Sequence, residues 1–426
     1  MEKKVMVGGI IIAAYLIFAL ISPILVNENA IKNWNSRVYW TDYPSLAPPE
    51  WVNLFGENLP PTENISSVKI GPDTYRMEYN FKYSQFPLNL KIKFLSQPEG
   101  NIVVNMTTPD GRTYTLYNGP AKELDFGRDA SLIKSFTENM GLNITFNELV
   151  IAAVSGGGTH FLLEKRVGSS WEPVHGTYTF TVKSSVRPYL WITGRVYGIM
   201  GTDTYGRDIW QAFVAGTRET LMMVFATAFT SVLLGVLLGL LGSLSSWGGT
   251  IVDGLSKISG MLPSIPLLIA LIPLFSTIGY YGNLEIPMWI FILTLALTLF
   301  GKISQNIKAM VTVEMSKEYV ESSRSLGASD LWILRKHILK TLTPYAASQF
   351  VLISAKTVAL VSLLGFFSVV PGMNWGTLMA MIIVQKALYY KAWWMVVPVG
   401  VAISILAISF ILLSMEIEKR KEVFMT

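Results

Sequence analysis

Apolar residues are distributed unevenly along the chain and divide it into contrasting parts. Residues 219–415 are almost continuously apolar, whereas residues 27–195 are polar and rich in aromatic side chains. Ahead of both, residues 6–26 form an apolar run of about 20 residues, the length that a helix needs to cross the hydrocarbon core of a bilayer. The pattern predicts a membrane anchor, then a polar domain, then a membrane-embedded helical bundle.

Within the apolar part, five further runs predict five more transmembrane helices and a total of six. Gly235, Gly239 and Gly242 are spaced by four and three residues, so they share one helix face, where a second helix can approach closely. Prolines interrupt the second of these runs, which predicts a kinked helix buried in the bundle. A polar break is expected at residues 247–257. The five runs are 220–243, 258–278, 286–300, 345–367 and 393–415.

The polar part has the alternation that is typical of half-buried β-strands. Apolar and polar residues alternate over 75–83 and again over 88–94. Residues 102–107 and 113–117 flank Pro109-Asp110-Gly111, which suits a hairpin turn. Residues 178–182 are predicted to form the last strand, and short helices are predicted near 131–140 and 147–154. We therefore expect an inserted β-rich, sandwich-like domain.

Composition supports this division and excludes several functions. The chain has 426 residues, is 51% hydrophobic and only 15% charged, which is too apolar for one soluble domain. Its net charge of +5 is modest and spread out, so no nucleic-acid partner is predicted. The absence of cysteine excludes disulfides, thiolate metal sites and cysteine nucleophiles.

Charge also predicts which side of the membrane each part faces. Lys3 and Lys4 precede the first run, which favours a cytosolic N-terminus. The alternative, a cleaved signal peptide, fits less well because the run is long and no cleavage site follows it. Residues 27–195 are then extracellular, and the C-terminus is cytosolic. The protein is predicted to be a multi-pass protein of the plasma membrane, in contact with lipid.

Two groups of polar residues in the extracellular part are candidates for modification or metal binding. Asn64, Asn105 and Asn143 each begin an Asn-x-Ser/Thr sequence, so they are candidate glycosylation sites. His160 and Glu164 lack further ligands nearby and are interpreted as ordinary surface residues. No metal site is predicted.

A polar, amphipathic hairpin at residues 313–344 interrupts the apolar part. Gly327 suits the end of a first short helix and Ser329 the start of a second, with Asp330 in its first turn. Such a hairpin fits a groove of a soluble partner, although a solvated loop that caps the bundle remains an alternative. A single apolar stripe is predicted along the second helix, formed by Leu331, Leu334, Ile338 and Leu342.

The hairpin resembles a known motif. Its sequence EYVESSRSLGASDLWILRKHIL is similar to the EAA loop of the permeases of binding-protein-dependent ABC importers, in the form found in the oligopeptide/dipeptide branch. GTDTYGRD at residues 201–208, with Gly216-Thr217-Arg218, resembles the motif that precedes the second helix in that branch. Residues 362–365 and Trp375-Gly376 resemble its late elements.

The resemblance implies the fold of an ABC importer permease and a set of partners. These are a second, related permease forming a heterodimer, two cytosolic ATPases that hold ATP and Mg, and an extracellular solute-binding protein. No catalytic residue and no cofactor is then expected in this chain, which also lacks the Gly-x-x-x-x-Gly-Lys phosphate-binding motif. The solutes would be peptides or similar oligomers, including oligosaccharides.

The resemblance also assigns roles to individual residues. In such importers the EAA helix docks in a cleft of the ATPase. The residues predicted to couple to the ATPase are Tyr319, Glu321, Ser322, Ser323, Leu326, Gly327, Ala328, Ser329 and Asp330. The residues that match the motif before the second helix are Gly201, Thr202, Asp203, Gly206, Arg207 and Asp208.

The chain departs from the family pattern at several positions. Ser322 and Ser323 replace the two alanines of the EAA motif, Lys340 replaces its first proline, and Val358 replaces a later acidic residue. The family's usual outer loop is also shorter, so the resemblance assigns no role to the β-rich domain. The predicted domains are 1–26, 27–195 and 196–426.

Lys356 lies in the middle of the fifth predicted span. A lysine there costs about 2.5 to 3.5 kcal/mol on insertion scales, so it must face a polar surface or a partner. It lines the translocation pathway in one hypothesis and pairs with an acidic residue of the partner permease in the other.

At the level of the whole chain, two alternatives stay open: a membrane-anchored receptor or adhesion protein, and a component of an ABC exporter.

Overall fold

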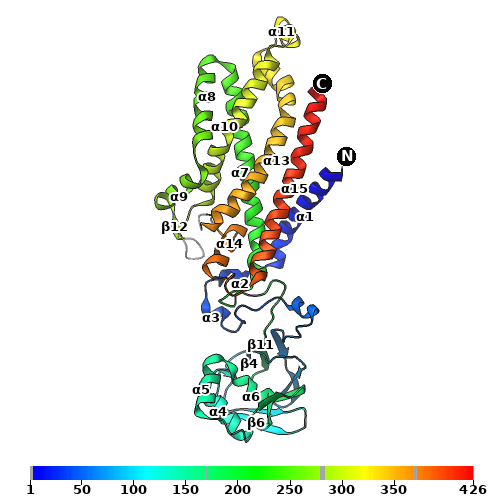
Figure 1. The fold of residues 1–426 in the computed structure, drawn as a ribbon, viewed down its shortest axis with the longest axis vertical. Helices are drawn as coiled ribbons and strands as arrows, with labels where there is room; N and C mark the ends of the chain where they lie inside the picture. The colour runs from blue at the N-terminus through cyan, green and yellow to red at the C-terminus, as the bar shows by residue number, and fades with distance from the viewer. Residues whose placement is uncertain (1–2, 168–169, 279–283, 368–369, 371, 426) are drawn as a thin grey trace. The chain divides into compact units, whose positions relative to one another are not determined.

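The computed structural model describes residues 3–167, 170–278, 284–367, 370 and 372–425. The chain forms two compact units (Figure 1). The helical unit comprises Met1–Asn35 and Gln211–Thr426, and the β unit comprises Ser36–Trp210. The predicted domain ranges stay predictions, and their ends at residues 1–2 and 426 lie outside the described residues.

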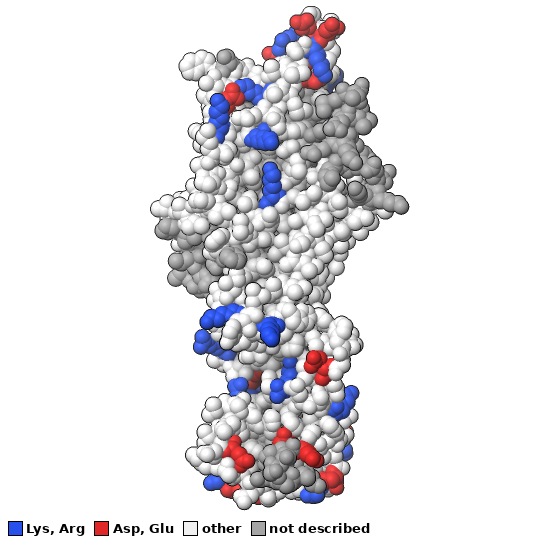
Figure 2. Space-filling view, in the orientation of Figure 1, with Lys and Arg blue, Asp and Glu red and all other residues white. Residues whose placement is uncertain are grey.

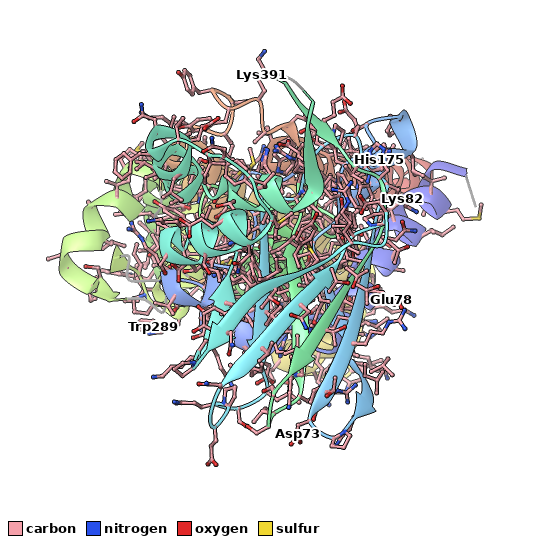
Figure 3. All side chains as sticks on the ribbon, turned by 90° about the horizontal axis from the view of Figure 1, so that it is seen from below. Asp73, Glu78, Lys82, His175, Trp289 and Lys391 are labelled. Atoms are coloured by element: carbon pink, nitrogen blue, oxygen red, sulfur yellow. The ribbon has the colours of Figure 1, made fainter. Side chains whose placement is uncertain are left out.

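Two antiparallel sheets build the β unit. One has five strands in the order β2-β3-β10-β5-β6, and the other has four in the order β1-β11-β4-β7. Figure 3 shows the course of β3, which runs from beside Asp73 past Glu78 to Lys82. The strands are β1 (Glu63–Ser66), β2 (Val68–Gly71), β3 (Thr74–Phe81), β4 (Asn89–Phe94), β5 (Ile102–Thr107), β6 (Thr113–Gly119), β7 (Glu123–Asp125), β10 (Gly176–Lys183) and β11 (Pro188–Thr193).

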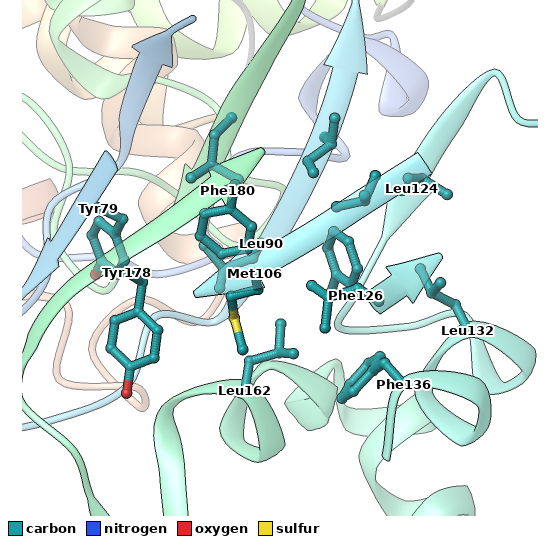
Figure 4. Packing of buried hydrophobic residues seen from close by; sticks show 14 of the residues in the cluster. Tyr79, Leu90, Met106, Leu124, Phe126, Leu132, Phe136, Leu162, Tyr178 and Phe180 are labelled. Carbon is teal, nitrogen blue, oxygen red and sulfur yellow. The ribbon is translucent and has the colours of Figure 1, made fainter. Parts of the chain in front are cut away.

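Both sheets contribute to one hydrophobic core (Figure 4). Phe180 of the five-stranded sheet and Leu90 of the four-stranded sheet are both fully buried in it. Helix α4 (Ala130–Asn139) adds Phe136 and α6 (His160–Leu163) adds Leu162, while α5 (Phe146–Ser155) packs beside them. A shared core between two sheets agrees with the predicted sandwich-like architecture, and α4 and α5 confirm the two predicted helices.

Alternation located β3, β4, β5, β6 and β10, and it missed the other strands of the unit. In β3, Tyr75, Met77, Tyr79 and Phe81 are buried and the residues between them are not, as predicted. The interpretation of residues 178–182 as the last strand was wrong, because β11 follows and pairs with both β1 and β4. Shorter elements complete the unit: α3 (Arg37–Trp40), η1 (Glu50–Phe55), η2 (Gly157–Thr159), β8 (Glu164–Val167) and β9 (Ser170–Pro173).

Strand β4 departs from the predicted alternation because its polar residues are buried as well. Lys91 is only 5% exposed, and its Nζ lies 2.9 Å from Asp42 Oδ1 and 2.7 Å from Asp125 Oδ2. Lys93 also pairs with Asp42. Burial by itself would raise the pKa of Asp42, but the hydrogen bonds from Lys93 and Lys91 outweigh it and hold that pKa below its ordinary value. The four-stranded sheet therefore carries a buried ion-pair network.

The helical unit contains five helices that are long and apolar enough to cross a membrane, or six if one bent pair counts as a span, among the described residues. The predicted total of six is therefore reached only with the bent pair. The helices are α1 (Lys3–Leu25), α2 (Glu28–Lys32), α7 (Ile209–Leu244), α8 (Ser246–Met261), α9 (Ser264–Phe275), α10 (Met288–Met315), α13 (Leu339–Phe366), α14 (Trp375–Val384) and α15 (Trp393–Met425); β12 (Thr277–Ile278) pairs with β13 (Leu284–Glu285).

The bent pair is α8 and α9, which meet at an angle of 84°. The predicted kink is confirmed, since Pro263 lies at the break between them. Two other expectations were wrong. Residues 247–257 are helical and no polar break, and Pro263 and Pro266 are exposed in the single chain instead of buried.

Glycines bring α7 against its neighbours, as their spacing predicted. A Cβ atom added to Gly235 would lie 2.6 Å from Ile303 of α10, and one added to Gly239 would lie 2.6 Å from Ile307. Such distances are far below van der Waals contact, so only glycine permits this approach of the two helices. Figure 1 shows the C-terminal end of α15 toward the end of the helical unit that carries the tip of the hairpin, whereas α1 begins about halfway along the unit.

We predict that Lys91→Met lowers the free energy of unfolding of the β unit by about 3 kcal/mol, because it leaves Asp125 and part of Asp42 buried without their cation. Urea denaturation of the full chain in detergent measures the change. Lys134→Met is the matched control. Lys134 is exposed and its Nζ lies 4.0 Å from Glu138, so its loss should change stability by less than about 0.5 kcal/mol. Equal effects of the two variants would contradict a stabilising network.

Candidate functional site

The hairpin has the local geometry that its sequence predicts. Helix α11 (Glu318–Ser325) ends before Gly327, whose φ of +86° lies in the left-handed region. Ser329 then caps α12 (Asp330–Ile333), with its side chain accepting a hydrogen bond from the backbone of Trp332. Arg324 and Asp330 form an ion pair of 2.9 Å across the turn. Both side chains are about half exposed, so this pair orients the turn and adds little stability.

The inner face of the hairpin is buried against the spans. Val320 of α11 and Ile333 of α12 are fully buried, in one cluster with Ile307 and Val311 of α10. The same cluster contains Ala228 of α7. The hairpin is therefore attached to two membrane helices by apolar packing. This packing argues against the alternative that the hairpin is a solvated loop capping the bundle.

The predicted apolar stripe of the second helix is partly wrong. Ile338 and Leu342 are buried as expected, but Leu331 is 76% exposed and Ile333 takes its place. The cause is a π-helical segment, η3 (Leu334–Ile338), between α12 and α13. A π-helical turn contains an extra residue and shifts the face of all the residues before it, so a periodicity of 3.6 fails across it.

The outer face of the hairpin is exposed and partly apolar. Leu326 is 89% exposed and Trp332 is 44% exposed. Figure 2 shows acidic and basic side chains gathered at this end of the helical unit, above a surface with few charges. A hollow of about 480 Å³ opens at the tip, and it brings together Ser323, Leu326, Gly327, Ala328, Ser329 and Trp332. Exposed apolar groups beside a charged rim are typical of a protein contact.

Other predicted coupling residues lie beside this hollow without lining it. Glu321 and Ser322 are exposed on α11, where the Ser322 hydroxyl donates to the carbonyl of Glu318. The Tyr319 hydroxyl donates to Glu314 Oε1 at 2.9 Å. Trp332 was not predicted, because the predicted stripe on the second helix contains only aliphatic residues.

The motif at residues 201–208 folds with the β unit. Thr202 Oγ1 donates to the carbonyl of Pro44 and accepts from the backbone of Ala47. Asp203 is 2% exposed, and its Oδ2 accepts a 2.6 Å hydrogen bond from Arg207 Nε. These contacts fix the loop to the segment after α3.

Glycine and aspartate complete this loop. Gly206 has a φ of +79°, and a Cβ there would lie 2.9 Å from the carbonyl oxygen of Tyr43. Gly201 also has a positive φ, of +69°. The Asp208 carboxylate accepts from the backbone of Trp210, at the start of α7. The motif thus serves to connect α7 to the β unit.

The late elements bring the backbones of two helices into direct contact. A Cβ added to Gly365 of α13 would lie 2.1 Å from Gly376 Cα in α14. Trp375 stacks on Phe213 of α7 with ring centroids 5.4 Å apart, and its backbone N–H donates to Thr220. Helix α14 itself was not predicted, because ten residues are too few to register as a span.

Two lysines stand in the middle of membrane helices. Lys356 of α13 is exposed in the single chain, and so is Lys302, which lies halfway along α10. The span predicted to end near residue 300 continues in α10, which has 28 residues and places Lys302 near its middle. Neither lysine has an ion pair among the described residues.

The remaining candidates are scattered over the β unit. Asn64 and Asn143 are exposed, whereas Asn105 is half-buried in β5. His160 Nδ1 lies 3.4 Å from Glu164 Oε1. The described part of the chain holds no group of three side chains that suits a metal ion.

Comparison with known proteins identifies the helical part. Residues 231–422 match the family described as the inner membrane component of binding-protein-dependent transport systems. This part of the chain is similar to that family of permeases. The match confirms the resemblance inferred from the hairpin, and with the apolar helices it makes the chain a multi-pass membrane protein. The family is one of transport subunits without catalytic activity of their own.

Individual relatives agree with the family. A putative peptide transport system permease of Brucella suis is 25% identical over 214 residues, which are 50% of this chain and 68% of the relative. The di/tripeptide permease DppC of Pseudomonas aeruginosa is 28% identical over 52% of this chain and 72% of its own. The glutathione permease GsiD of Pectobacterium atrosepticum is 28% identical over 42% and 58%. A solved MetNI methionine ABC transporter, inward facing, covers 47% of this chain and 97% of its own at 20% identity, with a TM-score of 0.31.

We predict that Gly365→Ala destabilises the permease by about 1 to 3 kcal/mol, because the new methyl group would overlap the backbone of Gly376. Gly400→Ala is the control: Gly400 also lies in a membrane helix, and nothing lies within 4 Å of its added Cβ. It should be neutral or slightly stabilising. Thermal unfolding in detergent compares the two, and an equal melting temperature would contradict the close contact.

Proposed function

We propose that this chain is the permease subunit of an ATP-driven importer for peptides or similar oligomeric solutes, and that it forms half of the translocation pathway. The relatives named above act on peptides or glutathione, which supports this class of solute. The observation that carries the proposal is the hairpin, packed on the spans along one face and exposed along the other.

The hairpin docks onto a cytosolic ATPase in this proposal. Its exposed Leu326 and the hollow around Gly327 receive a complementary surface of the partner, while Val320 and Ile333 pass a displacement to α10. ATP and Mg would be held by two such ATPases. This chain then needs no cofactor of its own.

The arrangement of the helical unit supports a single orientation. The hairpin and the C-terminal end of α15 lie toward one end of the helical unit, which we assign to the cytosol because Arg335, Lys336 and Lys340 are close by. Residues 27–195 are then extracellular. Asn64 and Asn143 would be accessible to glycosylation there, and Asn105 less so.

The proposal includes further partners. A second, related permease would complete the pathway, and an extracellular solute-binding protein would deliver the solute. The β unit is then a docking or shielding element for that delivery. The relatives reported above are transport permeases, which favours this function over a receptor, an adhesion protein or an exporter.

Lys302 and Lys356 line the pathway in this proposal. A charged side chain in the middle of a span cannot face hydrocarbon without a large free-energy cost, so each lysine must meet water, a solute or the second permease. Asn306, one turn from Lys302, donates to Tyr345 of α13 at 2.7 Å and joins the two helices on the cytosolic side of the lysines. A cationic pathway wall would suit solutes with a carboxylate.

We predict that Leu326→Asp reduces ATP-dependent uptake at least tenfold in the reconstituted importer, because a charge at the tip would be desolvated on docking. The same variant should no longer co-purify with an ATPase in mild detergent. Its folding should be unaffected, since Leu326 is 89% exposed.

Leu95→Asp is the matched control for this experiment. Leu95 is 72% exposed and lies in the β unit, so the same substitution there should leave ATPase recovery unchanged. Normal uptake and normal recovery of the ATPase with Leu326→Asp would refute the coupling role of the hairpin.

We predict that Lys356→Met lowers solute uptake about tenfold while the assembly of the importer stays intact. Lys340→Met, at the exposed cytosolic start of α13, is the control and should transport normally. Uptake and size-exclusion chromatography are measured together. If the variant instead separates the two permeases, Lys356 pairs with an acidic residue of the partner permease. Unchanged transport together with unchanged assembly would exclude both roles of Lys356.

A further inference from the structure

The β unit exposes an apolar surface around the short helix η1. Leu54 is 84% exposed and Phe55 is 79% exposed, while Trp51 and Ile199 are exposed by 39% and 54%. The indole N–H of Trp51 donates to the carbonyl of Ile199 at 2.9 Å, and the rings of Trp51 and Phe55 lie edge to face with centroids 6.2 Å apart. We call these four side chains the η1 surface. Apolar side chains gathered on a surface in this way are typical of a binding site.

Hydrogen bonds hold this part of the chain in one conformation. Asn53 Nδ2 donates to the carbonyl of Leu59 at 2.9 Å, and Asn53 Oδ1 accepts from the backbone N–H of Leu59 at 2.8 Å. The backbone N–H of Gly198 donates to Glu50 Oε1 at 3.0 Å, and the backbone N–H of Glu50 donates to the carbonyl of Gly198 at 2.9 Å. The exposure of the η1 surface is therefore a fixed property of this segment.

The η1 surface lies close to the start of α7. The carbonyl of Gly201 accepts a hydrogen bond of 3.1 Å from the backbone N–H of Ile209, which is the first residue of α7. Ile199 is two residues from Gly201, so their Cα atoms are separated by at most about 7 Å. Within the β unit, the η1 surface is thus held beside the first turn of a membrane helix.

This first turn of α7 lies at the surface of the bilayer. The apolar stretch of α1 that is long enough to cross a membrane ends at Leu25. Two residues later, the backbone N–H of Asn27 donates to Gln211 Oε1 at 2.7 Å. Gln211 follows Ile209 by two residues. Because a span begins and ends where the hydrocarbon ends, this contact places the start of α7 at the level of the headgroups.

Aromatic side chains mark the same level on α15. Tyr15 of α1 donates to the carbonyl of Ala402 at 3.0 Å, and a Cβ added to Gly8 would lie 2.8 Å from the carbonyl oxygen of Ser409. The two helices therefore run antiparallel, and α15 begins at the level where α1 ends. Exposed tyrosine and tryptophan side chains, which are enriched at membrane–water interfaces, lie there: Tyr389, Tyr390 and Trp393.

We propose that the η1 surface binds the lipid bilayer, with Leu54 and Phe55 inserted among the headgroups of the leaflet that faces the β unit. Apolar side chains of interfacial helices enter this region by about 5 to 10 Å. Residues 50–56 contain no lysine or arginine, so a zwitterionic bilayer suffices and no anionic lipid is required. Because this binding requires only the membrane helices, it is independent of the proposed import function.

A single fluorescent label tests the proposal, because the chain contains no cysteine that would compete for it. Phe55→Cys in the full chain is labelled with a nitrobenzoxadiazole probe and placed in nanodiscs of phosphatidylcholine. A fraction of the lipid carries a nitroxide quencher next to the headgroup. No other protein is present, so quenching of the probe reports on lipid alone.

Leu95→Cys, labelled in the same way, is the matched control. Leu95 is also apolar and is 72% exposed. It follows the end of β4, whereas Asn89 at the start of β4 pairs with Thr193, six residues before Ile199. The control position therefore lies at the far end of this strand from the η1 surface and should remain in water.

Quenching is expected to be at least about threefold stronger at position 55 than at position 95, because only position 55 enters the headgroup region. Adding Leu54→Asp to the labelled Phe55→Cys chain should reduce quenching to the level of position 95, since the new carboxylate resists desolvation. Equal quenching at positions 55 and 95 would overturn the inference, and so would quenching that Leu54→Asp leaves unchanged. Shielding of position 55 that appears only after another subunit is added would identify a protein contact and would also overturn it.

Discussion

Direct backbone contact at glycine is the constraint on which the helical unit depends. Lipid is as apolar as leucine, so helices in a membrane gain little from burying apolar surface and associate through close packing instead. Gly365 and Gly376 place α13 against α14, and Gly235 and Gly239 place α7 against Ile303 and Ile307. Each contact fails if one methyl group is added. The positions of the spans are therefore determined by a few residues that have no side chain.

The hairpin gains its rigidity from the same contacts. Ile307 faces Gly239 of α7 and also belongs to the apolar cluster that holds Val320 and Ile333. A displacement of the hairpin thus reaches α10 through apolar packing, and reaches α7 through the glycine contact. The exposed tip and these two spans are therefore linked through one buried apolar cluster.

Features that follow from the order of neighbouring residues could be predicted from the sequence. Features that depend on the packing of distant segments could not. The alternation of β3, the glycine face of α7 and the turn at Gly327 follow from local rules. The π-helical turn and the burial of Lys91 do not. The first shifts the phase of a helix without a sequence signal, and the second depends on Asp42, which is distant in sequence and supplies the compensating charge.

In the β unit, buried charged residues rather than glycine contacts fix the irregular segments of the chain. Burying apolar side chains away from water is favourable, but in the β unit Asp203, Arg207 and Lys91 are buried as well. A buried charge is tolerated only with a partner, so each one fixes a segment that is distant or irregular. The Asp203–Arg207 pair shapes the loop before α7, and Asp42 fixes the segment after α3 to the sheet. The Asp203–Arg207 pair therefore orders the loop at residues 201–208 within the β unit.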